Sequence, residues 1–215
     1  MTRLIKPLFQ AFLLITAVSL TTTQVHALDA KLLDQKVAEI EKRLNARLGV
    51  AVLDTQTGRS YQHRQAERFP LNSTFKVFAC AALLAKSYAG QIDLQSSRQI
   101  RASDIVTWSP VTKHRVGGEG MSLFELCTAT MTYSDNTAAN FVLKAVGGPA
   151  GLTAFFRSLG DRETRIDRYE PDSNRLKKGD PRDTTTPEAV LASFQNAVLG
   201  DVLSDDSREQ LLTWL

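Results

Sequence analysis

Ser73 and Lys76 are the residues whose types and spacing first suggest chemistry. Their separation places both side chains on one face, one turn apart, if the chain is helical there. A serine at the start of a helix has its hydroxyl near unpaired backbone N–H groups and the positive end of the helix dipole. A lysine beside it on an apolar helix costs too much to bury without a role. Ser-x-x-Lys alone is weak, because chance gives about one per chain of this size.

Two further clusters carry polar groups suited to catalysis. Ser134-Asp135-Asn136 offers a hydroxyl for proton relay and an amide for holding a carbonyl, although all three residue types also suit helix caps. In Glu170-Pro171-Asp172-Ser173-Asn174, the glutamate beside a serine could activate a water, and Asn174 could hold that water from its other side. Taken alone, Glu170 is more simply read as a solvated loop acid.

The helix that must position Ser73 and Lys76 is apolar almost all round, which indicates burial. Pro70 and Asn72 precede it, where turn and capping residues belong, and Gly90 is a plausible end. Upstream, an amphipathic pattern predicts a helix over residues 29–46, and residues 49–54 and 60–63 predict a β-hairpin.

The remainder of the chain reads as helices separated by loops. Residues 91–120 are polar and show no single secondary-structure pattern. Residues 161–186 show no hydrophobic period, and this segment is long for a loop in a compact domain. Thr186-Pro187-Glu188 opens a helix with Val190, Leu191, Phe194 and Val198 facing its core. The other predicted helices cover residues 122–131, 136–146, a segment around Leu152 that Gly160 ends, and 205–214.

Residues 1–27 resemble a secretory signal peptide. Arg3 and Lys6 precede an apolar run that is too short for a membrane span, and Val25-His26-Ala27 suits cleavage; a membrane anchor or a buried helix is the alternative. The chain after residue 27 contains 24 of the 26 basic residues and all 23 acidic ones, so its net charge is close to zero. No basic stripe with interleaved aromatics occurs, so we expect no nucleic-acid partner.

The cysteines and histidines limit the kinds of catalytic and metal site that the sequence supports. Cys80 and Cys127 are either a disulfide, which export favours, or two small buried thiols. His63 and His114 have no metal-ligand spacing, and no Gly-x-Ser-x-Gly occurs. We therefore expect neither a metal nor a cofactor, nor a Ser-His-Asp hydrolase.

Ser-x-x-Lys and Ser-Asp-Asn in this order, with helices between, resemble the class A serine β-lactamases. Residues 168–174, which read Arg-Tyr-Glu-Pro-x-x-Asn, and residues 182–187 resemble that family's Ω-loop and its exit. The resemblance covers the signal segment and residues 29–215. It implies an α/β (α+β) fold, with an all-helical subdomain and an antiparallel sheet subdomain, and a catalytic domain over residues 28–215.

The resemblance also implies roles for individual residues. Ser73 is the nucleophile, Lys76 and Glu170 share the removal of its proton, and Ser134 passes a proton to the lactam nitrogen. The substrate-binding residues are Asn136, Asn174 and Trp108, the last at the rim of the cleft. Structural roles fall to the Cys80–Cys127 disulfide and to an Arg168–Asp183 pair, whose alternative is an exposed salt bridge. The Glu170–Pro171 bond is expected to be cis.

The expected activity is hydrolysis of penicillin-type β-lactams by a periplasmic or secreted monomer, with water as co-substrate and no stable membrane association. Residues 165–171 look most like carbenicillin-hydrolysing enzymes, and Asn72 excludes the additional cysteine of some carbapenem-hydrolysing ones. A penicillin-binding DD-peptidase is the alternative enzyme.

The family's third motif, Lys-Thr-Gly, does not occur in the sequence. We therefore expect a C-terminally incomplete chain that lacks sheet strands, so that the 28–215 polypeptide folds poorly and has little activity. The alternative that is not an enzyme is a catalytically inactive remnant, which acts at most as a binding module.

Overall fold

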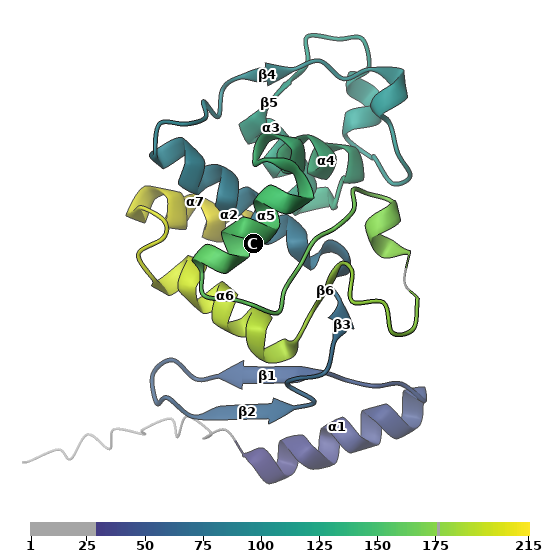
Figure 1. The fold of residues 1–215 in the computed structure, drawn as a ribbon, viewed down its shortest axis with the longest axis vertical. Coiled ribbons are helices and arrows are strands. Elements are labelled where there is room, and N and C mark those ends of the chain that lie inside the picture. The colour runs from purple at the N-terminus through teal and green to yellow at the C-terminus, as the bar shows by residue number, and fades with distance from the viewer. Residues whose placement is uncertain (1–28, 176) are drawn as a thin grey trace, which may run out of the picture.

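The computed structural model describes residues 29–175 and 177–215; the predicted signal peptide lies outside this part of the chain. Figure 1 shows a layer of one helix and a β-hairpin below a larger helical body. The mixture of helices with antiparallel strands confirms the predicted fold class. Over the same residues, no helix combines the length and apolar character needed to cross a bilayer.

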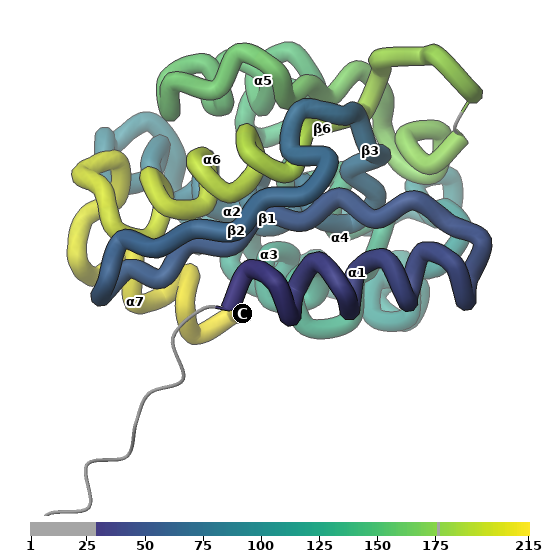
Figure 2. The backbone as a smooth tube through the Cα atoms, turned by 90° about the horizontal axis from the view of Figure 1, so that it is seen from below, coloured from purple at the N-terminus to yellow at the C-terminus, as the bar shows by residue number. Residues whose placement is uncertain are grey.

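The lower layer consists of α1 (Ala30–Leu44) and the hairpin of β1 (Val50–Leu53) and β2 (Ser60–His63), and α1 runs beside the hairpin in Figure 2. The strands pair antiparallel, with Val50 opposite His63. The predicted helix and hairpin are both confirmed. The apolar stripe of α1 is only partly covered in the described chain, because Val37 is buried while Leu32 and Leu44 are exposed.

The helical body is built around α2 (Phe75–Tyr88). Its neighbours are α3 (Leu123–Tyr133), α4 (Asn136–Ala145), α5 (Gly148–Ser158) and α7 (Asp205–Trp214), and α6 (Pro187–Leu199) packs against α7 and β1. Because α2 is apolar on nearly all sides, helices can cover it from several directions, and its residues from Phe78 to Leu84 are all buried. The Phe78 and Phe156 rings pack with centroids 4.7 Å apart. The burial predicted for this helix is confirmed.

Side-chain caps fix where several helices begin. Ser122 and Glu125 form a reciprocal capping box at α3, and Thr186 and Ser204 cap α6 and α7. The sequence did not predict the two-residue ladders of β3 (Phe69–Pro70) with β6 (Thr184–Thr185) and of β4 (Ser97–Arg98) with β5 (Met121–Ser122). Segments this short show no hydrophobic period.

Two details of the predicted helices are wrong. Asn72 does not cap α2: residues Asn72–Thr74 form one 3₁₀ turn, and neither this turn nor α2 has a side-chain cap. The predicted core face of α6 is also only partly correct. Val198 is buried, together with Ser193 and Ala197. Val190 and Phe194 are half-buried and pack against the core, as predicted, whereas Leu191 is not part of it. All three line an apolar groove of about 470 Å³ between α6 and β1.

Cys80 and Cys127 form a disulfide that ties α2 to α3, with their Cα atoms 5.8 Å apart. The predicted disulfide is therefore confirmed. Both residues are completely buried, so the bond lies in the same core that covers α2. Three further 3₁₀ turns, Ala102–Asp104, Thr112–Arg115 and Asp172–Asn174, interrupt the polar segments.

Candidate active site

Ser73 lies in the 3₁₀ turn that leads into α2, and its side chain is exposed. The preceding residue, Asn72, has φ +46°, a left-handed conformation that asparagine tolerates better than most residues. The Ser73 hydroxyl does not cap the helix. It lies 2.9 Å from Ser134 Oγ and 3.2 Å from Lys76 Nζ. The nucleophile candidate is thus open to solvent on one side and hydrogen-bonded on the other.

Lys76 is buried at the centre of the site, with four oxygens around its Nζ. It lies 2.8 Å from Ser134 O, 2.6 Å from Asn136 Oδ1, and 2.9 Å and 3.2 Å from the Ser134 and Ser73 hydroxyls. Burial lowers the pKa of Lys76, and the Glu170 and Asp135 carboxylates oppose that shift. Each of these oxygens is placed to accept a hydrogen bond from the Lys76 amine, and the cage holds Nζ beside the Ser73 hydroxyl.

The helix-cap interpretation of Ser134-Asp135-Asn136 is confirmed for Asp135, and the two neighbouring side chains contact Lys76. Asp135 is completely buried and caps α4 through the Ala138 N–H at 2.8 Å. Its other carboxylate oxygen accepts the backbone N–H groups of Val111 and Thr112, at 2.9 Å each. Ser134 ends α3 with φ +55°, so that its hydroxyl and carbonyl both face Lys76. The cap thus fixes the peptide that presents the two neighbouring side chains.

Glu170 lies in the polar loop, but its carboxyl is buried, so a solvated loop acid is the wrong description. Its Oε1 is 3.7 Å from Lys76 Nζ, and its Oε2 accepts from Asn174 Nδ2 at 2.6 Å. Burial raises the pKa of Glu170, and the Lys76 charge opposes that shift. The Glu170–Pro171 peptide bond is cis, as predicted.

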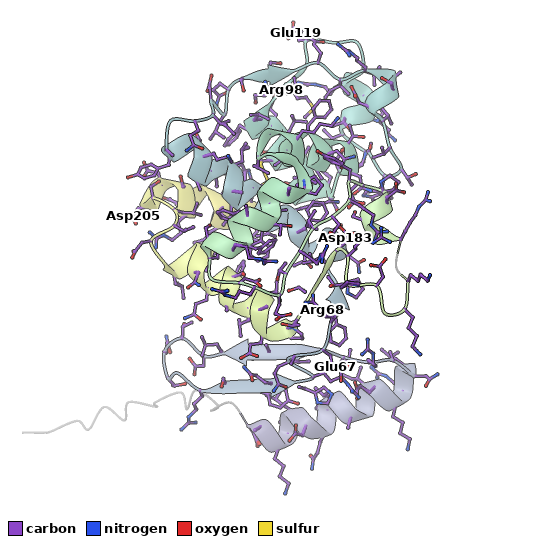
Figure 3. All side chains as sticks on the ribbon, viewed as in Figure 1. Glu67, Arg68, Arg98, Glu119, Asp183 and Asp205 are labelled. Atoms are coloured by element: carbon purple, nitrogen blue, oxygen red, sulfur yellow. A yellow bond between two sulfur atoms is a disulfide. The ribbon has the colours of Figure 1, made fainter. Side chains whose placement is uncertain are left out.

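The loop is held at its base by Arg168 and Asp183. Arg168 Nε donates to Asp183 Oδ2 at 2.6 Å, and the backbone N–H groups of Asp167 and Arg168 donate to the other oxygen at 2.8 and 3.0 Å. Figure 3 shows Asp183 where the loop returns toward β6. Because the Asp183 side chain is 1% exposed, the pair is not the exposed salt bridge of the alternative interpretation.

Trp108 and Asn136 are joined by a backbone hydrogen bond. The Trp108 side chain is exposed, and its Nε1 donates to Tyr133 O at 3.1 Å. The Trp108 carbonyl accepts from the Asn136 backbone N–H at 2.9 Å. Asn136 Nδ2 donates to Thr107 O at 2.8 Å while its Oδ1 faces Lys76, so one amide N–H is left for another acceptor.

Sequence reasoning missed Asn140. Its Nδ2 donates to Glu170 O and its Oδ1 accepts from Glu170 N, both at 2.9 Å, so its amide holds the Glu170 backbone. The available signal was its spacing of one turn from Asn136 on the same helix. In the described part of the chain, no group of three or more His, Cys, Asp or Glu side chains is arranged to hold a metal ion.

Comparison with known proteins identifies relatives of this chain. The model of the "Beta-lactamase enzyme family" matches residues 32–215. "Beta-lactamase CARB-3" of Pseudomonas aeruginosa is 48% identical over 85% of the chain, and "Beta-lactamase AER-1" of Aeromonas hydrophila is 47% identical over 92%. These alignments cover 63% and 65% of the two relatives, so the chain spans less than two thirds of their length.

Solved structures show the same relationship. The "Last common ancestor of Gram-negative bacteria (GNCA4) beta-lactamase class A" is 55% identical, with a TM-score of 0.83 over 85% of this chain and 70% of that one. A β-lactamase from Xanthomonas campestris is 45% identical, with a TM-score of 0.84 over 86% of this chain and 69% of that one. The chain therefore belongs to the class A β-lactamase family.

Proposed function

We propose that this protein hydrolyses the β-lactam ring of penicillin-type antibiotics through a serine acyl-enzyme and so confers antibiotic resistance. The observation that carries the proposal is the position of Lys76 Nζ, 3.2 Å from the Ser73 hydroxyl and 3.7 Å from the Glu170 carboxyl. An exposed hydroxyl beside a buried amine and a buried carboxyl supplies a nucleophile and two groups able to take protons.

Acylation begins when Ser73 Oγ attacks the lactam carbonyl and forms the new C–O bond. Its proton passes to Lys76, which burial favours as a neutral amine, or to Glu170. The C–N bond of the ring then breaks. Ser134 Oγ lies 2.9 Å from both Ser73 Oγ and Lys76 Nζ, so it is placed to hand a proton to the leaving nitrogen. Asn136 and Trp108 flank the substrate.

Deacylation uses the Glu170 carboxylate as base. It takes a proton from water, the water oxygen attacks the ester carbonyl, and the bond to Ser73 Oγ breaks as that oxygen regains a proton. Asn174 is placed to fix both Glu170, through the 2.6 Å hydrogen bond, and that water. An enzyme that must not hydrolyse its acyl intermediate, such as a transpeptidase, has no use for a water activated by a glutamate, so this buried and oriented glutamate favours the hydrolase.

The proposal includes the location and the oligomeric state of the protein. Residues 1–27 act as a signal peptide, residues 28–215 belong to the catalytic domain, and the exported protein is a periplasmic or secreted monomer that does not associate stably with the membrane. The Cys80–Cys127 disulfide supports export, because such bonds persist in oxidising compartments. The substrates are penicillins, carbenicillin among them.

The test is mass spectrometry of the protein produced from its natural reading frame and mixed with benzylpenicillin. The wild type should turn over substrate with little adduct, Glu170→Gln should accumulate an adduct of the intact penicillin mass, and Ser73→Ala should form none. A long-lived adduct on the wild type would instead indicate a DD-peptidase. Lactam turnover by Ser73→Ala at the wild-type rate would contradict the proposed mechanism.

A further inference from the structure

The hydroxyl of Ser173 is a buried polar group that the mechanism above does not use. Ser173 is 2% exposed, and its Oγ makes no regular hydrogen bond with the described residues. Glu170 Oε1 is likewise buried and makes no regular hydrogen bond with the described residues. Buried polar atoms rarely stay unpaired, because each one costs the free energy of its lost hydration. Two such atoms three residues apart suggest a pair.

The backbone keeps Ser173 and Glu170 at close range. Ser173 lies in the 3₁₀ turn Asp172–Asn174, and its N–H donates to Tyr169 O at 3.0 Å. Glu170 is fixed independently by the two hydrogen bonds of the Asn140 amide to its backbone. Neither residue can therefore move away without breaking these contacts.

The two oxygens of the Glu170 carboxyl have different surroundings. Oε2 already accepts from Asn174 Nδ2 at 2.6 Å, whereas Oε1 is 3.7 Å from Lys76 Nζ, too far for a direct hydrogen bond. The Ser173 hydroxyl is a dipole that acts on this carboxyl and lowers the pKa of Glu170, against the larger opposite effect of burial. A hydroxyl hydrogen rotates freely, so small side-chain movements can aim it at Oε1.

We propose that Ser173 is a positioning residue for Glu170. The Ser173 hydroxyl donates to Glu170 Oε1, while Asn174 Nδ2 donates to Glu170 Oε2. The pair of donors keeps the carboxyl ionised and correctly turned in a site that otherwise favours its neutral form. This inference rests on the proposed function only for the role of Glu170 as the deacylation base.

The charges around the carboxyl set the direction of the effect. Lys76 on α2 favours ionised Glu170, whereas Asp183 at the return of the loop opposes it, although Arg168 compensates the Asp183 charge. Loss of the Ser173 hydroxyl leaves these charges in place and removes a dipole that favours the anion. Ser173→Ala should therefore raise the pKa of Glu170, so a higher pH is needed to form the base.

The first experiment does not depend on activity. The carboxyl carbon of Glu170 is followed by ¹³C NMR against pH in the unliganded protein, and Glu170→Gln identifies the signal. The midpoint should move up in Ser173→Ala and stay near the wild type in Ser173→Thr, which keeps the hydroxyl. Ser193→Ala is the matched control, because Ser193 is also buried and donates to a carboxylate outside the site, that of Asp161 at 2.8 Å. An unchanged midpoint in Ser173→Ala would refute the inference.

The second experiment follows penicillin turnover against pH. On the acid limb, the turnover rate of Ser173→Ala should fall about tenfold or more relative to the wild type, with little change above neutral pH, since the loss of one hydrogen bond to a charged group is of at least that size. An equal loss at every pH would indicate a merely structural role and count against the inference. If the wild type lacks turnover, the proposed function fails while the NMR titration still decides the role of Ser173. Should Ser173→Ala not fold, Ser173→Cys, which keeps the volume but donates weakly, replaces it.

Discussion

Lys76 illustrates how a single residue connects the parts of the candidate site. Its position one turn after Ser73 follows from the sequence, because helical spacing alone brings the two side chains together. Its other contacts come from Ser134 and Asn136, 58 and 60 residues further along the chain. No local pattern predicts those distances, so the interpretation of Ser134-Asp135-Asn136 depended on resemblance to a family. The burial that lowers the pKa of Lys76, and so favours its neutral amine, is likewise a property of the fold.

The charge of Glu170 controls the base strength of Lys76. Burial lowers the pKa of Lys76, and the Glu170 carboxylate partly raises it again. In Glu170→Gln the opposing charge is gone, so the pKa of Lys76 falls further and more neutral amine is present at a given acidic pH. The acid limb of the acylation rate, measured by rapid quench and mass spectrometry, should therefore move to lower pH. Acylation that collapses at every pH would assign proton removal from Ser73 to Glu170.

At the scale of elements, the helices were predictable and the polar loop was not. Caps and apolar periods located α3, α6 and α7 closely, because those signals lie within the helix itself. The loop over residues 161–186 has no period, and its shape comes from distant contacts. Asn140 on α4 holds Glu170, and Arg68 near β3 contacts Thr184, neither of which a local pattern reveals.

The Arg168–Asp183 pair should be the main anchor of this loop. Asp183→Asn keeps the size of the side chain but leaves the Arg168 guanidinium, which is 19% exposed, without its counter-charge. Breaking such a pair from one side costs about 3 kcal/mol, measured as the free energy of unfolding in denaturant. Glu163→Gln is the control, since Glu163 pairs with Arg68 at the surface and should cost about 0–1 kcal/mol. Equal effects of the two changes would contradict this view of the loop.

The disulfide connects two elements of the site: α2, which carries Lys76 and follows the turn with Ser73, and α3, which ends at Ser134. It closes a loop with a sequence separation of 47 residues. Replacing both cysteines by alanine should lower the free energy of unfolding by about 2–4 kcal/mol, since the unfolded chain gains freedom. Dithiothreitol should destabilise the wild type and leave the double variant unaffected. A wild-type melting temperature that dithiothreitol does not change would rule out this contribution.

The whole molecule depends on how the hairpin layer meets the helical body. Gly49 lies just before β1, beside Phe69 of β3 and Pro187 of α6, where the two layers approach (Figure 1). A Cβ at Gly49 would come within 2.6 Å of Pro187 Cγ and would also collide with the Phe69 ring. The ring of a proline cannot rotate away, so the layers must separate locally to accept a methyl group. This glycine is required for close approach rather than for a turn.

Gly49→Ala should therefore destabilise the protein by about 1–3 kcal/mol, read from the denaturant midpoint. Gly118→Ala is the control, because its added Cβ would meet only Arg115 O at 3.5 Å, an ordinary contact, and should change stability by less than about 0.5 kcal/mol. Ser73 and Glu170 both contact Lys76 within the helical body and its loop, so acylation of the folded Gly49→Ala protein should stay near the wild-type rate. A lost acylation rate with unchanged stability would mean that this junction positions the nucleophile, and the separation of the two layers argued here would be wrong.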